Sequence, residues 1–177
     1  MLGYWNNHAA TAQVIDADGW FHTGDQASIS DSGHVRITGR IKDILVLSNG
    51  EKIPPGDMEN AIAMDGMIDQ VLVVGEGRPY LAALVVVDET YWSLRAPGQP
   101  YTNEALQREE VVKEVLSRVR RQLSSFPGYA KIRKAAQLAE PWTLENGLLT
   151  PTLKVRKQQV LERYADLIDR MYGAGPG

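Results

Sequence analysis

The chain has 177 residues, of which 44% are hydrophobic and 23% charged, with a formal net charge of −3 and no cysteine. This length is typical of one globular domain, or of one domain with part of another. The lack of cysteine excludes disulfide scaffolds, iron–sulfur clusters, cysteine zinc sites and thiol nucleophiles. No apolar run approaches the roughly 20 residues of a membrane span, and residues 1–10 do not resemble a secretion signal. We therefore expect a cytoplasmic protein.

Charge is distributed unevenly along the chain. Residues 1–89 carry 5 Lys and Arg against 13 Asp and Glu, whereas residues 90–177 carry 14 against 9. The basic half would suit an anionic ligand such as a nucleotide or coenzyme A, although solvated helix faces explain the excess equally well. The excess is too small to predict nucleic-acid binding, which needs a clustered and strongly basic face.

The first half of the sequence predicts short elements separated by polar and glycine-rich turns. In chain order we expect a helical turn at 9–14, a strand at 26–29, a turn at 31–33, a strand at 34–38, a further segment at 41–47, and a helix beginning at Pro54-Pro55-Gly56. Between the last two lies the Ser48-Asn49-Gly50 turn, whose glycine can adopt a positive φ.

The second half contains clearer patterns. Two β-branched runs, at 70–74 and 80–87, flank a glycine-rich loop and predict a hairpin. Their continuous apolar character indicates strands that are covered on both faces. Apolar residues at helical spacing predict helices at about 103–123 and 155–171, with a weaker strand at 131–138 between them. These elements predict an α+β fold, a small mixed sheet with a central hairpin packed by helices.

Three clusters combine glycine with charge in a way that a plain hydrophobic core does not need. In the first, residues 19–25, a tight turn ends at Asp25, whose carboxylate could accept hydrogen bonds from a vicinal diol such as ribose. In the second, residues 38–43, the rigid fork of Arg40 suits hydroxyl or phosphate oxygens. The alternatives are a turn aspartate that caps backbone amides and a salt-bridged strand end.

The third cluster, residues 145–157, places Lys154 on a loop rich in Thr, Pro and Gly, just ahead of a helix. Such a lysine can reach another surface as a mobile point charge, and the alternative is an ordinary solvated lysine. The three histidines show no metal-ligand spacing, so no metal site is expected. The chain also lacks a G-x-S-x-G elbow, a P-loop and a G-x-G-x-x-G motif.

In this order and spacing, the three clusters resemble the C-terminal part of the adenylate-forming enzymes, which include acyl-CoA synthetases, luciferases and nonribosomal-peptide adenylation domains. Long-chain fatty acid–CoA ligases are the most similar branch, because the last segment contains LTPTLK where many relatives carry a Ser-Gly-Lys version. The matching segments are GYWNN, DADGWFHTGD, ITGRIKDILVLSNGEKIPPGDMENAI and PWTLENGLLTPTLKVRKQQV.

The resemblance implies a reaction in two steps. A carboxylate attacks the α-phosphate of ATP to give an acyl-adenylate and pyrophosphate, and the thiol of coenzyme A then displaces AMP. The implied roles are the following: Asp25 and Arg40 hold the ribose of ATP, Lys42 is the hinge of a rotating domain, Ser48, Asn49 and Gly50 shape the channel for coenzyme A, and Lys154 bridges the carboxylate and α-phosphate oxygens.

The resemblance also implies that the chain is part of a larger enzyme. Residues 1–41 would be the tail of an N-terminal adenylation domain, including its short hairpin, 42–172 the mobile C-terminal domain and 173–177 a flexible tail. The phosphate-binding loop, the acyl pocket and the acid that helps hold Mg²⁺ would belong to the missing N-terminal domain, which is the expected partner along with the fatty acid. We therefore expect Met1 not to be the start of the whole enzyme, and the chain alone to be inactive.

Three alternatives stay open at this point. The chain could be a natural short protein that keeps the fold as a non-catalytic binding or regulatory module. It could belong to a ligase for another carboxylic acid, because the residues that would select the acyl chain are not in it. Recruitment to a membrane surface by a fatty substrate or a partner is also open, although neither long helix opposes a basic face to a large aromatic one.

Overall fold

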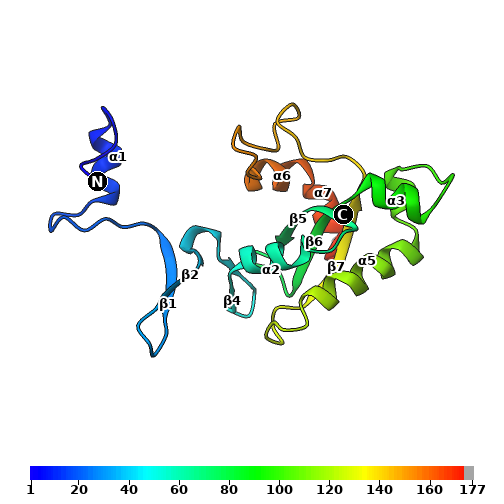
Figure 1. The fold of residues 1–177 in the computed structure, drawn as a ribbon, viewed down its shortest axis with the longest axis horizontal. Helices are drawn as coiled ribbons and strands as arrows, with labels where there is room; N and C mark the ends of the chain where they lie inside the picture. Colours follow the sequence, from blue (N-terminus) through cyan, green and yellow to red (C-terminus); the bar gives the residue numbers. More distant parts are fainter. Residues whose placement is uncertain (174–177) are drawn as a thin grey trace. The chain divides into compact units, whose positions relative to one another are not determined.

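The computed structural model describes residues 1–173, and its elements are labelled in Figure 1. The chain divides into two compact units, Met1–Ile44 and a second that begins at Leu45. The expected flexible tail at 173–177 lies, except for Gly173, outside the described residues.

The first unit contains one short helix and one hairpin. Helix α1 (His8–Val14) begins where the side-chain oxygen of Asn7 accepts a hydrogen bond from the amide of Ala10, as expected of a helix N-cap. Strands β1 (Asp25–Ile29) and β2 (Val35–Arg40) pair antiparallel. The unit ends in a 3₁₀ helix, η1 (Ile41–Asp43).

The second unit is built around a three-stranded sheet. Its strands are β5 (Ile68–Val74), β6 (Leu81–Val87) and β7 (Ile132–Leu138), in the order β5-β6-β7. The β5 and β6 strands pair antiparallel, whereas β6 and β7 pair parallel, so the sheet is mixed as expected. A separate two-stranded ladder joins β3 (Leu45–Val46) to β4 (Lys52–Ile53).

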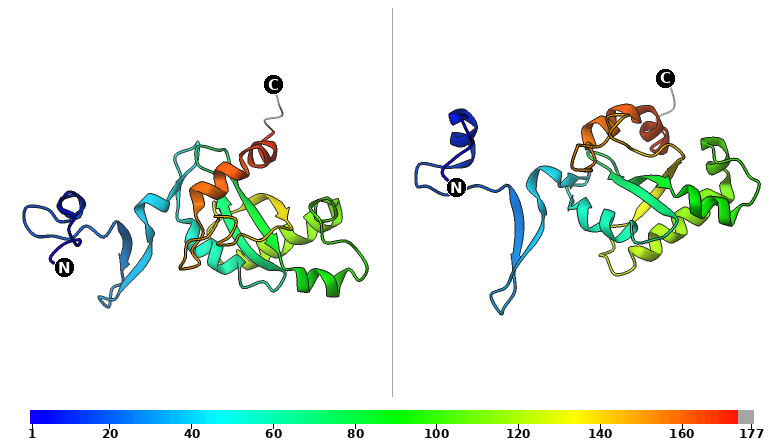
Figure 2. Two further views of the ribbon diagram at one scale, coloured as in Figure 1. Left: turned by 90° about the horizontal axis from the view of Figure 1, so that it is seen from above. Right: turned by 45° about the horizontal axis from the view of Figure 1, so that its top comes forward.

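Helices cover this sheet on both faces (Figures 1 and 2). Alternate residues of β6 belong to two separate hydrophobic clusters, as the two-residue repeat of a strand requires. One cluster includes buried residues of α2 (Pro55–Ile62), α3 (Glu89–Arg95), α4 (Asn103–Leu106) and α5 (Glu109–Gln122). The other includes residues of α6 (Lys157–Arg163) and α7 (Ala165–Met171).

The α+β class and the mixed sheet with a central hairpin are confirmed, but both long helices are interrupted. The helix expected at 103–123 is α4 and α5, separated by an extended Arg108. The helix expected at 155–171 begins only at Lys157 and is divided at Tyr164. Residues 155 and 156 are not helical, because Val155 forms an isolated antiparallel bridge with Leu149.

Candidate functional site

Asp25 and Arg40, which belong to separate clusters in the sequence, lie opposite each other in the first hairpin. They are the terminal pair of the β1–β2 ladder, in which Thr38 is left as an extra residue by a shift of register after Gln26. The Nε atom of Arg40 lies 3.3 Å from Oδ1 of Asp25. The carboxylate is half-buried beside this cation, whereas the Arg40 side chain is largely exposed. The pair offers both an acceptor and a donor to a hydroxyl-bearing ligand.

Lys42 directly follows this hairpin, within η1. Just beyond the two strands, the amide of Ile41 donates to the carbonyl of Gly24 at 2.8 Å. Lys42 itself is exposed, and the boundary between the two compact units lies only two residues further, after Ile44. The backbone at Lys42 therefore stands at the junction of the units.

The Ser48-Asn49-Gly50 turn connects β3 to β4, and its three residues are exposed. Gly50 has φ of +84°, which favours glycine, and its amide donates to the carbonyl of Leu47 at 2.8 Å. The amide of Leu47 in turn donates to the carbonyl of Glu51 at 2.9 Å. The turn is thus narrow, and only Ser48 and Asn49 contribute side chains to it.

The loop between β5 and β6 supports this turn. The amide of Val46 donates to Oε2 of Glu76 at 2.7 Å, and the carbonyl of Val46 accepts from the amide of Gly77 at 2.8 Å. The amide of Ser48 donates to the carbonyl of Arg78 at 3.0 Å. Three successive residues of the loop therefore hold the strand that enters the turn.

Lys154 is exposed at the end of a closed loop, residues 150–154. The amide of Thr150 donates to the carbonyl of Lys154 at 2.8 Å, and the amide of Lys154 donates to Oγ1 of Thr150 at 3.1 Å. Leu153 completes the loop with φ of +59°, in the left-handed region. The backbone is fixed at the residue whose long side chain reaches into solvent.

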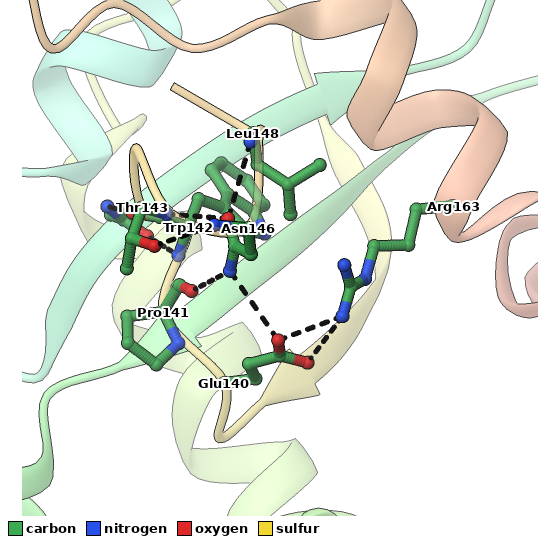
Figure 3. Close-up of polar contacts among 8 residues, drawn as sticks. Glu140, Pro141, Trp142, Thr143, Asn146, Leu148 and Arg163 are labelled. Carbon is green, nitrogen blue, oxygen red and sulfur yellow. Dashed lines mark hydrogen bonds and ion pairs between the residues drawn. The ribbon is translucent and has the colours of Figure 1, made fainter. Parts of the chain in front are cut away.

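Asn146 organises the segment that leads into this loop (Figure 3). Its Oδ1 atom accepts from the amides of Thr143 and Leu148, at 2.9 and 3.3 Å. Its Nδ2 atom donates to the carbonyl of Pro141 at 2.9 Å and lies 3.5 Å from Oε1 of Glu140. The carboxamide therefore satisfies four polar groups of one bend.

Two further contacts attach the bend to the rest of the domain. Glu140 forms an ion pair with Arg163 of α6, with Nη2 at 2.8 and 3.0 Å from its two oxygens (Figure 3). Trp142 is 1% exposed, and its backbone exchanges two hydrogen bonds with the side chain of Gln70 on β5, at 2.7 and 2.9 Å. The Lys154 loop is therefore anchored to both the sheet and a helix.

The two loops are attached to opposite faces of the same sheet. Leu47 and Ile53, on either side of the Ser48-Asn49-Gly50 turn, belong to the cluster that contains α2 and α5. Leu148 and Leu149, which precede the Lys154 loop, belong to the cluster that contains α6 and α7.

A cavity of about 680 Å³ lies at the C-terminal end of α5 and the start of β7. Three cationic side chains line it, those of Arg120, Lys131 and Arg133. Its described lining contains no carboxylate. Leu123, Phe126, Ala130 and Ile132 supply apolar surface. The guanidinium carbon of Arg133 lies 5.5 Å from the ring centre of Tyr80, in the loop that supports the Ser48-Asn49-Gly50 turn.

A family model described as the AMP-binding enzyme C-terminal domain matches residues 42–175. The chain belongs to this family. Its sequence is 35% identical to the probable acyl-activating enzyme 16, chloroplastic, of Arabidopsis thaliana, and 31% identical to the long-chain-fatty-acid–CoA ligase FadD15 of Mycobacterium tuberculosis. These matches cover 97% and 96% of the chain but 26% and 29% of the relatives. This AMP-binding C-terminal domain with its preceding unit thus spans about a quarter of the curated relatives it matches.

Solved structures show the same fold. The adenylation domain of a carboxylic acid reductase from Segniliparus rugosus, in complex with AMP and a co-purified carboxylic acid, matches with a TM-score of 0.80 at 25% identity. That match covers 97% of this chain and 26% of the other. ATP-bound MatB from Rhodopseudomonas palustris, at 21% identity, matches with a TM-score of 0.57.

The contacts that hold the loops of this domain in place could not be predicted from the sequence. Asn146 and Gly147 suggest a turn by composition alone, and Gly147 does have φ of +77°. The bonds from Gln70 and Arg163 have no local signal, because they join residues far apart in the chain. Within residues 1–173, no helix has both the length and the hydrophobicity to cross a bilayer.

The Asn146→Ala substitution should loosen the Lys154 loop. The amide of Thr143 would lose its acceptor, and an unsatisfied part-buried group costs about 1–3 kcal/mol. The amide of Leu148 would keep only its bond to the carbonyl of Thr143, at 3.1 Å. We expect faster hydrogen–deuterium exchange across residues 143–154, measured by mass spectrometry on this chain. Asn49→Ala, in the exposed turn, is the matched control and should change exchange only near Glu51. Unchanged exchange at Thr143 in the Asn146 variant would contradict the assignment.

Proposed function

We propose that this chain is the C-terminal portion of an ATP-dependent, AMP-forming long-chain fatty acid–CoA ligase. The names of two relatives support this choice, the long-chain-fatty-acid–CoA ligases FadD15 of M. tuberculosis and ACSBG1 of Rattus norvegicus, at 31% and 30% identity. The observation that carries the proposal is the exposed Lys154 on a loop with a hydrogen-bonded base. That geometry suits a cation delivered to a reaction centre on another domain.

Lys154 would act in the first step, the formation of the acyl-adenylate. Negative charge develops on the carboxylate and α-phosphate oxygens as the new bond forms, and a positioned ammonium group stabilises it. Asp25 would accept hydrogen bonds from the ribose hydroxyls, and Arg40 would fix that carboxylate and donate to the same sugar. The described residues contain no group of three side chains suited to a metal ion. We therefore assign no step to Mg²⁺ within this chain and expect the N-terminal domain to hold it.

The second step would use the other side of the domain. The narrow Ser48-Asn49-Gly50 turn would border the channel for the thiol arm of coenzyme A, because it is exposed and Gly50 has no side chain to prevent close approach. The cavity lined by Arg120, Lys131 and Arg133 would receive the phosphates of the same substrate, since it combines three cations with apolar surface. Tyr80 connects the two features through its contact with Arg133.

Rotation of the domain would alternate these two surfaces. The Lys154 loop and the Ser48-Asn49-Gly50 turn are attached to opposite faces of one sheet, so a rigid domain can present only one of them to a single active site at a time. Lys42, next to the boundary of the compact units, would be the hinge. The expected domain division is thus 1–41 and 42–172, and we expect a cytoplasmic enzyme whose missing domain supplies the acyl pocket.

A ligase for another carboxylic acid is the second candidate. It is favoured by the two carboxylic acid reductase adenylation domains, from S. rugosus and Mycobacterium chelonae, that match this chain with TM-scores of 0.80 and 0.79. A panel of acids of different length, offered to the full-length enzyme, distinguishes the candidates. A stand-alone module is distinguished by whether a phosphate-binding loop is encoded upstream of residue 1.

In the full-length enzyme, Lys154→Ala should slow formation of the acyl-adenylate by on the order of 10²–10³. Thioester formation from preformed acyl-adenylate should be nearly unchanged, because the lysine then faces away from the site. Pyrophosphate release and thioester production measure the two half-reactions separately. Lys113→Ala, an exposed lysine on α5, is the control and should alter neither. Equal losses in both half-reactions would refute the role.

Arg120→Ala should raise the KM for coenzyme A by about tenfold, which corresponds to one charge-assisted phosphate contact of about 1.4 kcal/mol. The KM for pantetheine, which lacks the phosphates, should stay the same. Arg121→Ala on the same helix, outside the cavity lining, is the matched control. An equal effect on both thiols would show that the cavity does not bind the phosphates.

Lys42→Pro should impede rotation. Proline fixes φ near −65° and restricts the residue before it, so the backbone at this position would lose the freedom that a hinge needs. We expect one half-reaction, the thioester step, to slow by about tenfold or more, with adenylate formation retained. Lys42→Ala removes the charge but not the backbone freedom and should be nearly neutral. Full speed in both steps for the proline variant would show that the hinge lies elsewhere.

A further inference from the structure

We propose that Arg78 is a positioning residue for the thioester step, because it connects the Ser48-Asn49-Gly50 turn to the C-terminal helix α7. This inference rests on the proposed function of the turn. Arg78 would not touch the substrate, and it would act by fixing the loop on which the turn is built.

The backbone of Arg78 faces the turn. Its carbonyl accepts the amide of Ser48 at 3.0 Å, next to the bonds that Glu76 and Gly77 make with Val46. Inside the loop, the amide of Arg78 donates to the carbonyl of Gly75 at 2.9 Å, and Gly77 has φ of +65°. That turn bond shapes the loop, and contacts outside the loop fix its position on the domain.

The side chain of Arg78 supplies such a contact, in the other direction. Its guanidinium forms an ion pair with Asp169 of α7, and its central carbon lies 4.9 Å from the ring centre of Tyr172. Burial raises the pKa of the Tyr172 phenol to about 12, so the ring stays neutral and favourable to a cation at ordinary pH. One residue thus joins the turn to the end of α7.

Both ends of the same loop are also attached to α7 and the residue after it. The hydroxyl of Tyr172 donates to the carbonyl of Val74 at 3.2 Å, where the loop begins. The hydroxyl of Tyr80, where the loop ends, donates to the carbonyl of Met171 at 2.8 Å, and the two tyrosine rings lie 4.9 Å apart. Arg78 holds the middle of the loop, which is the part that contacts the turn.

Gly75 shows how closely the parts fit together. A side-chain carbon at this position would lie 2.9 Å from Cδ2 of Leu81 and 3.2 Å from Cδ2 of Leu47, the residue before the turn. The loop and the turn therefore share one packed surface, and a displacement of the loop moves the turn as well.

The effect of Arg78 on the position of the turn can be separated from its effect on the stability of the domain. The Arg78 and Asp169 side chains are 37% and 48% exposed, and ion pairs with such exposure contribute little to global stability. Loss of the pair should therefore leave the domain folded and the turn displaced or mobile. The thioester step should weaken, and the adenylation step, which depends on the opposite face of the sheet, should not.

The experiment compares Arg78→Ala, Asp169→Asn and Arg78→Lys with the control Arg95→Ala, an exposed arginine of α3 that is paired with Glu114 of α5. Exchange of the amides at residues 46–50 is measured on this chain, and the two half-reactions are measured separately on the full-length enzyme. We expect faster exchange in the first two variants and a KM for pantetheine about tenfold higher, with adenylate formation unchanged. Pantetheine is the probe because it does not use the cationic cavity. Arg78→Lys should give an intermediate result, because lysine keeps the charge but loses the planar stacking on Tyr172.

Three results would overturn the inference, and they are distinguishable. Unchanged exchange at residues 46–50 in Arg78→Ala would show that Arg78 does not hold the turn, whatever the Lys154→Ala result. Faster exchange with an unchanged thioester step would show that the turn is held by Arg78 but does not border the thiol channel, which refutes that part of the proposed function. Equal slowing of both half-reactions would show a merely structural role.

Discussion

Strand β6 has no exposed residue along its seven positions, so both faces of the sheet must be covered for the domain to fold. This constraint places helices on both sides and gives the domain two separate apolar layers. Each layer also fixes the base of one polar loop, through Leu47 and Ile53 on one side and Leu148 and Leu149 on the other. The bases of both loops are therefore supported by one buried strand.

The strands could be predicted from the sequence because their signal is local. Runs of β-branched residues at 70–74 and 80–87 identify β5 and β6 without any tertiary information. The breaks in the helices could not be predicted in the same way. The turn between α4 and α5 is stabilised by a bond from Gln107 to the carbonyl of Gln137 on β7, and no pattern near residue 107 signals that partner. The ladder of β3 and β4 has only two residues per strand, too few for a periodic signal.

The candidate site shows the same limit. Asp25, Arg40 and Lys154 carry unusual charge in glycine-rich surroundings, and the motifs around them are enough to suggest their roles by resemblance to a family. The pairing of Asp25 with Arg40 follows from the hairpin register, which includes a bulge that composition does not reveal. The supports come from much further away, as in the bonds between Gln70 and Trp142 and between Arg78 and Asp169. Such contacts depend on the completed fold, and residue types alone do not contain them.

The left-handed conformation of Leu153 has an implication for how this loop could be altered. Glycine carries little steric cost at positive φ, whereas an L-residue with a side chain gives up about 1–2 kcal/mol there. The leucine side chain is 73% exposed, so it recovers little of that cost through burial within this unit. At position 153, glycine would remove the backbone strain, whereas leucine keeps an apolar side chain available to a neighbouring surface. Protein engineers could choose between these two properties one residue from the ammonium group of Lys154.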